Sequence, residues 1–465
     1  MDFMTPTQEA LTTSNQGKLL EQINRPQRPG WPQRFRQSPV RALLISFPSR
    51  LFFLVFIGYL LITFFYDAVL SQQPLAQPSS PSVLVLDFIS PWRRFDSLYF
   101  LHIARSGYDL PRLPAFFPLY PLLVKIAAWP LGEHFTVAGL LIAWVCCWGS
   151  YLWFYRLAAR EYGERVAKLA LIAFAAFPMG FFTFAPYSES VFLLVSIGAI
   201  ERARAGRPWQ AGTLAALGML TRPTGILLLI PLGWELGRRT PFVLSQVDRL
   251  KAALARRVAA LRQTKPTWRG STELLARQEA FLTPLSWTAW LSLALIPLAL
   301  LGYIAYLQLV TGNPLAFLRS ESTVWYRHPT LPWTLLPLFV TAYQQVMQLG
   351  DPWLFVRNTA DLILVIPVSG LVVYYALRWR LVWLGAMFYQ IAIVLLLIAV
   401  PTYPSHYRYE VLLSTQRFML PAFPIFLLMG HLGVARPRLY RALVLVSTAI
   451  LLVYVLHFLD GLFIA

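Results

Sequence analysis

The run LVVYYALRWRLVWLGAMFYQIAIVLLLIAV, residues 371–400, decides the fold class of this chain. Its only charged residues are Arg378 and Arg380, which follow one apolar stretch and precede another. A helix needs about 20 mostly apolar residues to cross a bilayer, whereas a buried helix of a soluble protein shows a shorter, striped pattern. A similar run, LFFLVFIGYLLITFF, occupies residues 51–65. These runs predict an all-α, polytopic integral membrane protein.

The composition of the whole chain agrees with this class. The 465 residues are 57% hydrophobic and 13% charged, against about 25% charged in ordinary soluble domains. The apolar runs predict about eleven transmembrane helices, near 51–70, 135–155, 166–185, 187–201, 209–222, 224–237, 286–311, 358–377, 381–400, 418–434 and 439–461.

The distribution of basic residues predicts how the chain is threaded through the membrane. The net charge is +19, but the basic residues lie in short segments between apolar runs, as the positive-inside rule expects of cytoplasmic loops. No stripe of alternating basic and aromatic residues accompanies them, so nucleic acid is not a predicted partner. The predicted cytoplasmic segments are a flexible basic tail, 1–50, and loops at 156–168, 201–207, 238–285, 378–380 and 436–441.

One segment decides on which side of the membrane the later loops lie. AFFPLYPLLVKIAAWPLG, residues 115–132, is interrupted by three prolines and Lys125, so it is predicted as an interfacial or re-entrant helix. If it does not cross, residues 51–465 form a single transmembrane domain with an external C-terminus. External segments are then expected at 71–134, 312–357 and 401–417, with interfacial helices in the first.

The stretch PWRRFDSLYFLHIARSGYD, residues 91–109, carries the clearest chemical pattern. It places Asp96 close to Arg93 and Arg94, among aromatic residues at the predicted external edge of the membrane. A glycosidase needs two carboxylates. Transfer of a sugar from a lipid phosphate needs one general base for the acceptor hydroxyl and cations for the departing phosphate. A solvated salt-bridge cluster would show the same composition.

Several motifs resemble the PIG-V-type mannosyltransferases of the GT-C superfamily, bacterial relatives of the second mannosyltransferase of GPI-anchor synthesis. The resemblance is carried by FDSLYFLHIARSGYD at 95–109, AFFPLYPLL at 115–123, PYSES at 186–190, LTRPTG at 220–225, TGNPLAF at 311–317 and STQRFMLPAFPIF at 414–426. The sequence has Phe95 where that family usually has Trp, and His102 where Arg is common.

The resemblance implies a GT-C-like fold and an inverting mannosyl transfer from a polyprenyl-phosphate mannose to a lipid-linked or glycan acceptor. It implies catalysis at the non-cytoplasmic face, in a bacterial plasma membrane or a eukaryotic endoplasmic reticulum membrane, with Asp96 as the base. The candidate ligands of the donor phosphate are Arg93, Arg94, Arg417 and Arg222. The candidate substrate-binding residues are His102, Arg105, Tyr108, Asp109, Tyr187 and Glu189.

Metal and cofactor predictions are negative. The sequence has no GxGxxG or Walker-type loop, so a nucleotide donor is not indicated. The His, Asp and Glu residues show no metal-ligand spacing, so no structural metal is predicted, and a loosely held divalent cation remains open.

Two other classes share these features. A transporter or flippase of lipids or glycolipids would have the same spans, but its ionisable residues are expected near the bilayer midplane. Here Glu189, Arg222 and Arg417 lie near the ends of apolar runs, which favours chemistry at the interface. Another polyprenyl-phosphate-sugar transferase, for protein O-mannosylation or arabinosyl transfer, would fit the composition equally well.

Overall fold

The computed structural model describes residues 89–239, 286–350, 384–403 and 414–459, together with the short pieces 354–356, 358–359, 370, 411–412 and 461. All of them belong to one compact unit, Phe47–Ala465. Their regular elements are helices, apart from an isolated antiparallel bridge between Arg327 and Thr402. The prediction of an all-α protein is confirmed for this part of the chain.

The helices follow one another closely along the chain. The α-helices are α6 (Asp96–Ser106), α7 (Leu119–Ala128), α8 (Phe135–Tyr162), α9 (Glu164–Ala175), α10 (Glu189–Arg204), α11 (Pro208–Met219), α12 (Leu229–Gly237), α15 (Leu295–Thr311), α16 (Ala316–Thr323), α17 (Leu335–Leu349), α19 (Leu384–Ala399), α20 (Thr415–Phe418), α21 (Pro424–Ala435) and α22 (Pro437–Leu459). The 3₁₀-helices are η2 (Ser90–Trp92), η3 (Leu113–Ala115), η4 (Trp129–Leu131), η5 (Pro178–Thr183), η6 (Pro223–Leu228), η7 (Trp287–Ala294) and η8 (Pro332–Thr334).

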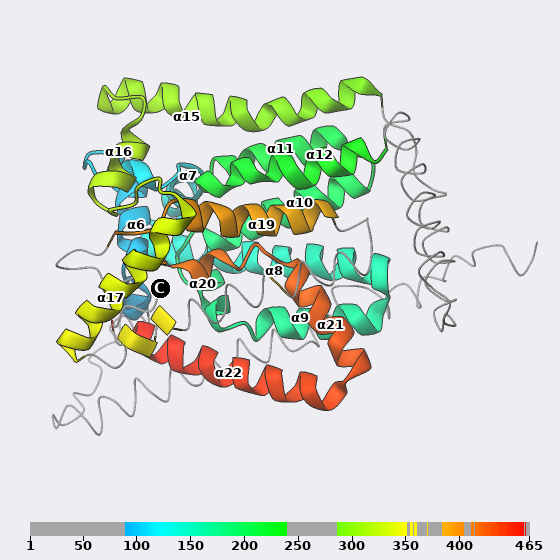
Figure 1. The fold of residues 1–465 in the computed structure, drawn as a ribbon. Coiled ribbons are helices and arrows are strands. Elements are labelled where there is room, and N and C mark those ends of the chain that lie inside the picture. The colour runs from blue at the N-terminus through cyan, green and yellow to red at the C-terminus, as the bar shows by residue number, and fades with distance from the viewer. Residues whose placement is uncertain are drawn as a thin grey trace, which may run out of the picture. The chain divides into compact units, whose positions relative to one another are not determined.

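The longer helices lie side by side, and several short ones gather at one end of them (Figure 1). Helix α10 packs between α8 and α11, α11 packs on α15, α12 packs on α19, and α21 packs on α9. The short helices α6, α7, α16 and α17 lie at the end where α22 finishes (Figure 1). This end is called the site end below.

Most predicted spans coincide with helical segments. The segments predicted from 135 to 237, and those at 286–311, 381–400, 418–434 and 439–461, each correspond to described helices. The segments 51–70 and most of 358–377 lie outside the described residues. By length and composition, three described helical segments can cross a membrane: Phe135–Tyr162, Trp287–Thr311 and Pro437–Leu459.

The proline-interrupted segment 115–132 forms only short helices. Helix α7 has 10 residues, so it is about 15 Å long, half the thickness of a hydrocarbon core. It begins after Pro118 and is followed by η4, which ends at Gly132 in the left-handed conformation. This length agrees with the prediction that the segment does not cross the bilayer.

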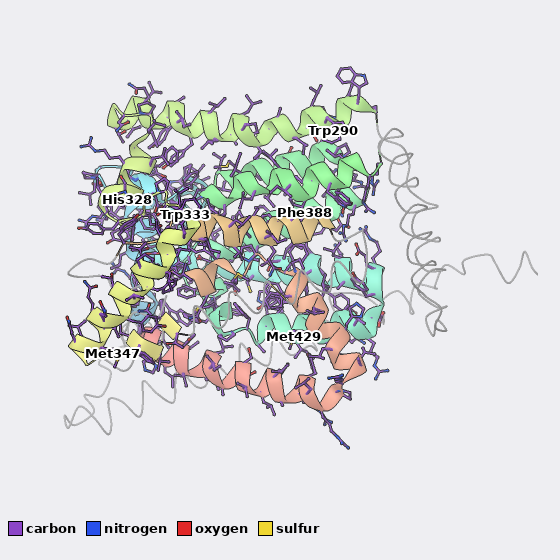
Figure 2. All side chains as sticks on the ribbon, viewed as in Figure 1. Trp290, His328, Trp333, Met347, Phe388 and Met429 are labelled. Atoms are coloured by element: carbon purple, nitrogen blue, oxygen red, sulfur yellow. The ribbon has the colours of Figure 1, made fainter. Side chains whose placement is uncertain are left out.

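Apolar side chains cover the outside of the helices as well as their contacts (Figure 2). On α15, Leu298 and Leu301 are each 57% exposed, and Leu309 is 85% exposed. On α22, Leu445 and Val446 are also exposed. Water-soluble monomers rarely expose contiguous apolar faces of this kind. The described helices therefore have the surface of a membrane protein.

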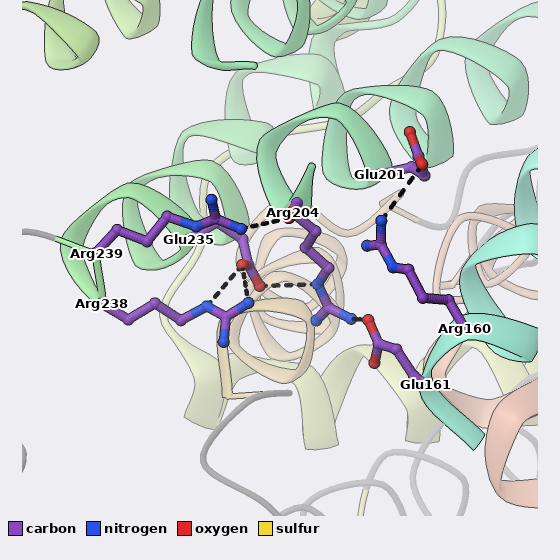
Figure 3. Close-up of polar contacts among 7 residues, drawn as sticks. All are labelled: Arg160, Glu161, Glu201, Arg204, Glu235, Arg238 and Arg239. Carbon is purple, nitrogen blue, oxygen red and sulfur yellow. Dashed lines mark hydrogen bonds and ion pairs between the residues drawn. The ribbon is translucent and has the colours of Figure 1, made fainter. Parts of the chain in front are cut away.

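A buried ion-pair network ties helices together at the end away from the site (Figure 3). Arg204, at the end of α10, contacts Glu161 near the end of α8 and Glu235 near the end of α12, the latter at 2.9 Å. Arg238 also contacts Glu235, and Arg160 forms a separate pair with Glu201 at 3.6 Å beside the network. The network residues lie in or beside the predicted cytoplasmic segments 156–168 and 201–207 and at the start of 238–285. Which side of the membrane this end faces stays a prediction.

Candidate active site

Asp96 begins α6 and follows a strained residue. Phe95 has φ 52° and ψ −122°, a conformation that L-residues rarely adopt and that costs about 1–3 kcal/mol. Its ring contacts Phe458 near the end of α22, with 5.8 Å between centroids. The next residue, Ser97, is fully buried, and its hydroxyl donates to the carbonyl of Arg94 at 2.8 Å. Asp96 is therefore held at a helix start, where a carboxylate is favoured by the backbone dipoles.

Arg222 leaves the end of α11 because of the proline that follows it. A residue before proline is restricted to extended backbone, and Arg222 has φ −153° and ψ 147°. The chain then turns back, and Gly225 packs so tightly that an added Cβ would lie 2.5 Å from the backbone of Met219. The LTRPTG motif thus turns Arg222 away from the axis of α11 and packs η6 against the end of α11.

Arg417 lies in the short helix α20 and bridges two carboxylates. Its Nη1 lies 2.8 Å from Asp96 Oδ2, and its Nε lies 2.8 Å from Glu189 Oε1. Glu189 Oε1 is also 2.5 Å from Arg222 Nη1. The Glu189 contacts act as ion pairs rather than as well-aligned hydrogen bonds. Burial alone lowers the pKa of Arg417, but Glu189 and Asp96 together raise it above its usual range. Arg417 is therefore a permanent cation between two carboxylates.

These groups form the wall of a cavity of about 650 Å³, its open mouth included. Its polar lining contains Asp96, Arg222 and Arg417, together with Glu321 of α16 and Arg327 on the loop after α16. The remaining lining residues are Phe100, Ala115, Phe116, Phe117, Ser188, Thr221, Pro223, Trp325, Ser414 and Phe418. Glu189 is absent from this lining and lies behind the two arginines, with its side chain 3% exposed.

All three predicted external segments contribute to this cavity. Asp96 comes from the segment 71–134, Arg327 from 312–357 and Arg417 from 401–417. A backbone hydrogen bond from Tyr403 N to the carbonyl of Tyr326, at 2.9 Å, joins the last two segments, and Thr330 N donates to the carbonyl of Ala399 at the end of α19, at 2.8 Å. The cavity therefore exists only in the folded chain.

Backbone strain concentrates at the same place. Of the four non-glycine residues with positive φ in the described part of the chain, three are Phe95, Tyr326 and Ser414. Phe95 precedes Asp96, Tyr326 lies between two lining residues, and Ser414 itself lines the cavity. Strained backbone is characteristic of functional sites, where the surrounding structure enforces it.

The predicted phosphate ligands separate into two pairs. Arg222 and Arg417 line the cavity, as described above. Arg93 is exposed, and Arg94 donates from Nη2 to the carbonyl of Leu459 at 3.4 Å. Neither Arg93 nor Arg94 is among the lining residues. In this conformation Arg94 caps the end of α22.

The predicted substrate ligands of α6 and its following loop lie away from the cavity. His102 Nε2 and Asp109 Oδ1 form an exposed pair at 2.7 Å, and Arg105 is exposed. Tyr108 is buried and donates to the carbonyl of Phe116 at 2.7 Å, and burial raises its pKa well above the usual value. None of the four is a lining residue. Their predicted role in substrate binding stays a prediction.

Tyr187 is a buried residue that contacts Arg94 and Arg417 beside the cavity. It is fully buried, and its hydroxyl donates to the carbonyl of Arg94 at 2.9 Å. The guanidinium carbon of Arg417 lies 5.5 Å from the centroid of its ring, a distance at which cation–π attraction operates. Tyr187 thus fixes the approach of α10 to α6 and the position of Arg417.

Sequence reasoning missed three lining residues. Glu321 lies in α16, and Trp325 and Arg327 lie on the loop after it, in a stretch without a recognisable motif that only folding brings to Asp96. Ser414 and Phe418 could have been found, because they flank Arg417 in the STQRF motif.

No group of three His, Cys, Asp or Glu side chains suited to a metal ion occurs within the described residues. The prediction that the protein holds no metal or cofactor remains untested.

Comparisons with known proteins agree with the motifs. The family described as "Mannosyltransferase (PIG-V)" matches residues 41–254. The GPI alpha-1,6-mannosyltransferase 2 of Mus musculus is 31% identical over 168 residues, which cover 33% of this chain and 34% of that protein. The Rattus norvegicus protein of the same name is 29% identical, covering 34% of each chain. The matched region thus spans about a third of the length of these relatives.

Solved structures give a weaker likeness. An oligosaccharyltransferase of Archaeoglobus fulgidus, in a complex with Zn and sulfate, superposes with a TM-score of 0.38 at 12% identity, covering 79% of this chain and 49% of that one. The archaeal oligosaccharyltransferase AglB from the same organism, in complex with an inhibitory peptide and a dolichol-phosphate, gives 0.37 at 14% identity, covering 80% and 51%. These scores are too low to assign a common fold.

The matched region contains the lining residues Asp96 and Arg222 and the buried Glu189 behind the cavity wall. It also contains the motifs around them, FDSLYFLHIARSGYD, PYSES and LTRPTG. Over residues 41–254, this chain is similar to the mannosyltransferase (PIG-V) family.

Proposed function

We propose that this protein is a membrane mannosyltransferase that moves mannose, with inversion, from a polyprenyl-phosphate mannose to a lipid-linked or glycan acceptor. The observation that carries the proposal is the position of Asp96. It lies on the wall of the cavity, its side chain is 13% exposed, and Arg417 holds its Oδ2 at 2.8 Å. The family match over residues 41–254 supports the sugar, and the membrane-protein surface supports a lipid-linked donor.

The proposed transfer takes place in one step. Asp96 accepts the proton of the acceptor hydroxyl while the hydroxyl oxygen forms a bond to the anomeric carbon of mannose. The bond from that carbon to the phosphate oxygen breaks, and its electron pair leaves with the polyprenyl phosphate. A phosphate is a good leaving group, so a second carboxylic acid is not required, in contrast to a glycosidase. The Asp96 carboxylate at the cavity wall can supply the one base that this transfer requires.

The negative charge that develops on the phosphate requires cations in a water-poor cavity. Arg222 and Arg417 line the cavity and are best placed to supply them. Arg93 and Arg94 would require a change of conformation to take part. A loosely held divalent cation could supplement the arginines, although the mechanism does not depend on one.

The charge distribution supports a location for the reaction. Residues of all three predicted external segments line the cavity, while the Arg204 network at the other end of α10 lies in or beside the predicted cytoplasmic segments 156–168 and 201–207. Helix α10 runs from Glu189 to Arg204, so the two ends are separated by about 22 Å. We place the active site at the non-cytoplasmic face of a bacterial plasma membrane, or of the endoplasmic reticulum membrane in a eukaryote, in contact with membrane lipids.

An assay of transfer tests this function. Protein in vesicles is supplied with radiolabelled polyprenyl-phosphate mannose and a membrane lipid extract, and the labelled product is identified. Asp96→Asn retains the shape of the side chain but removes the base, so turnover is expected to fall about 100- to 10,000-fold. Glu164→Gln is the matched control, because Glu164 is exposed and pairs with Lys168 at the opposite end.

Two results would contradict the proposal. If Asp96→Asn stays within a few-fold of the parent, Asp96 serves only as an ion-pair partner, and the proposed role of Asp96 as base is wrong. If polyprenyl-phosphate mannose gives no product while another polyprenyl-phosphate sugar does, the protein transfers a different sugar.

A further inference from the structure

Aromatic side chains form much of the cavity lining beside its charged groups. They are Phe100, Phe116, Phe117, Trp325 and Phe418. In the transfer proposed above, the two arginines hold the phosphate and the carboxylate holds the acceptor hydroxyl. The mannosyl unit joins these two ends of the reaction, so its ring must lie among the remaining side chains of the lining. An aromatic residue is therefore a candidate for the contact with the sugar.

The five aromatic residues differ in how much of their surface a ligand can reach. Phe100, Phe116 and Phe117 are buried, with 5%, 8% and 2% of their surface exposed. Phe418 is partly exposed, but three guanidinium carbons already lie 4.8 to 5.8 Å from its ring centroid. Trp325 is also partly exposed. Of the five, Trp325 is therefore best placed to contact a ligand.

Neighbouring rings hold the indole of Trp325 in position. The ring of Tyr99 lies 6.2 Å from it at an interplanar angle of 89°, and the ring of Phe116 lies 5.9 Å from it at 73°. Such edge-to-face pairs are the favoured arrangement of aromatic rings. The next residue, Tyr326, has φ 52°, so the backbone beside Trp325 is strained. A side chain that is fixed before the ligand arrives loses little conformational entropy on binding.

The surface that Trp325 offers to the cavity is suited to a sugar ring. Its indole nitrogen is buried, so the accessible part of the ring is formed by carbon. The face of an aromatic ring is electron-rich, and one face of a pyranose ring carries C–H groups with a small positive charge. A sugar can therefore stack on the indole while its hydroxyl groups point toward the polar side chains of the lining.

We propose that Trp325 binds the mannose of the lipid donor by stacking against the sugar ring. The proposal rests on the function proposed above and adds to it the residue that holds the sugar. Arg222 and Arg417 hold the phosphate, Trp325 holds the ring, and Asp96 holds the acceptor hydroxyl. The stacked ring keeps the anomeric carbon between the phosphate oxygen that leaves and the hydroxyl oxygen that attacks.

The assignment predicts an effect that depends on the presence of the sugar. Trp325→Leu keeps an apolar side chain and removes the aromatic face, so affinity for polyprenyl-phosphate mannose is expected to fall about 3- to 10-fold. Affinity for the methyl ester of the same polyprenyl phosphate, which has the same chain and charge but no sugar, should change little. In the transfer assay the loss should appear in KM rather than in kcat, because stacking operates equally in the bound donor and in the transition state.

The experiment measures binding without turnover. Purified full-length protein in nanodiscs is titrated with short-chain forms of the two diesters, without acceptor, and affinity is measured by calorimetry. Trp325→Phe retains an aromatic face and should recover part of the lost affinity. Trp325→Met is a second variant without a ring, so that a folding defect of Trp325→Leu does not stop the test. Trp333→Leu is the matched control, because Trp333 (Figure 2) is 70% exposed in η8 and lies outside the cavity lining.

The possible outcomes separate this inference from the proposed function. A loss confined to the mannosyl diester, partly recovered in Trp325→Phe and absent in Trp333→Leu, supports the assignment. Equal losses for both diesters would mean that Trp325 contacts the polyprenyl chain or only supports the loop, and unchanged affinities would mean that it does not contact the donor. Either result overturns the assignment and leaves the proposed function standing. If the parent binds neither diester, the proposed donor itself is wrong.

Discussion

Replacing Glu189 by Gln tests whether the carboxylate behind the cavity wall holds two arginines in place. The change is nearly isosteric and removes only the charge. In the parent, Glu189 is 3% exposed and lies within 2.8 Å of both Arg222 and Arg417. In the variant, Arg417 keeps Asp96, whereas Arg222 keeps only a 3.4 Å contact with the Ser188 hydroxyl and its place over Phe418.

The size of the effect follows from the burial of these groups. Two unit charges about 4 Å apart attract by about 4 kcal/mol at the effective dielectric constant of proteins. Removing one partner of a buried pair costs about 3–5 kcal/mol, because the other charge stays desolvated. Glu189→Gln is therefore expected to lower the free energy of unfolding by about 3–5 kcal/mol. Arg222→Gln should cost less, because Glu189 retains Arg417.

The double variant distinguishes ion pairing from general disruption. In Glu189→Gln/Arg222→Gln no cation is left without a carboxylate, so its loss of stability should be smaller than the sum of the two single losses. A coupling energy of about 2 kcal/mol is expected for side chains in direct contact. Unfolding is measured by titrating SDS into detergent micelles and following helix content. Glu164→Gln, in an exposed pair, should stay within about 1 kcal/mol of the parent.

Additive losses in the double variant, or a Glu189→Gln variant as stable as Glu164→Gln, would refute this reasoning. Either result would mean that the buried carboxylate contributes little to the positions of Arg222 and Arg417.

Two further predictions follow from packing and topology. Gly225→Ala places a methyl group 2.5 Å from the backbone of Met219, so it should abolish folding and activity, whereas Gly302→Ala, with no atom within 4 Å of the new Cβ, should be neutral in expression and thermal-shift measurements. Ser106→Cys, exposed at the site end, should react with an impermeant thiol reagent in intact cells, and Ala205→Cys, exposed beside the Arg204 network, should react only after permeabilisation; the reverse pattern would invert the predicted threading.

Local motifs in the sequence point to residues that the fold brings together at the cavity. These motifs are FDSLYF with Asp96, PYSES with Glu189, LTRPTG with Arg222 and STQRF with Arg417. Each motif has a local physical cause, such as the extended backbone that Pro223 imposes on Arg222. The roles of individual residues were harder to predict, because a motif does not show which side chains are in contact in the folded protein. Glu189 was predicted to bind substrate and lies instead behind two arginines.

Which arginines lie beside Asp96 depends on contacts between segments that are distant in the sequence. Arg93 and Arg94 are neighbours of Asp96 in the sequence, yet Arg94 caps the end of α22, and Arg417 is the residue that contacts Asp96. Arg327 carried no motif at all. Its position follows from the strained turn at Tyr326 and the bridge to Thr402, and neither feature has a local sequence signal.

The sequence by itself determined that this is an all-helical membrane protein, because run length and hydropathy are local properties and the bilayer demands about 20 apolar residues for a crossing. It also determined that the basic loops alternate with apolar segments along the chain. Only the tertiary structure decided which charges share the cavity and which lie behind its wall. An ion pair forms wherever folding brings opposite charges within a few ångströms, and burial sets its strength, so neither its partners nor its energy can be derived from spacing along the chain.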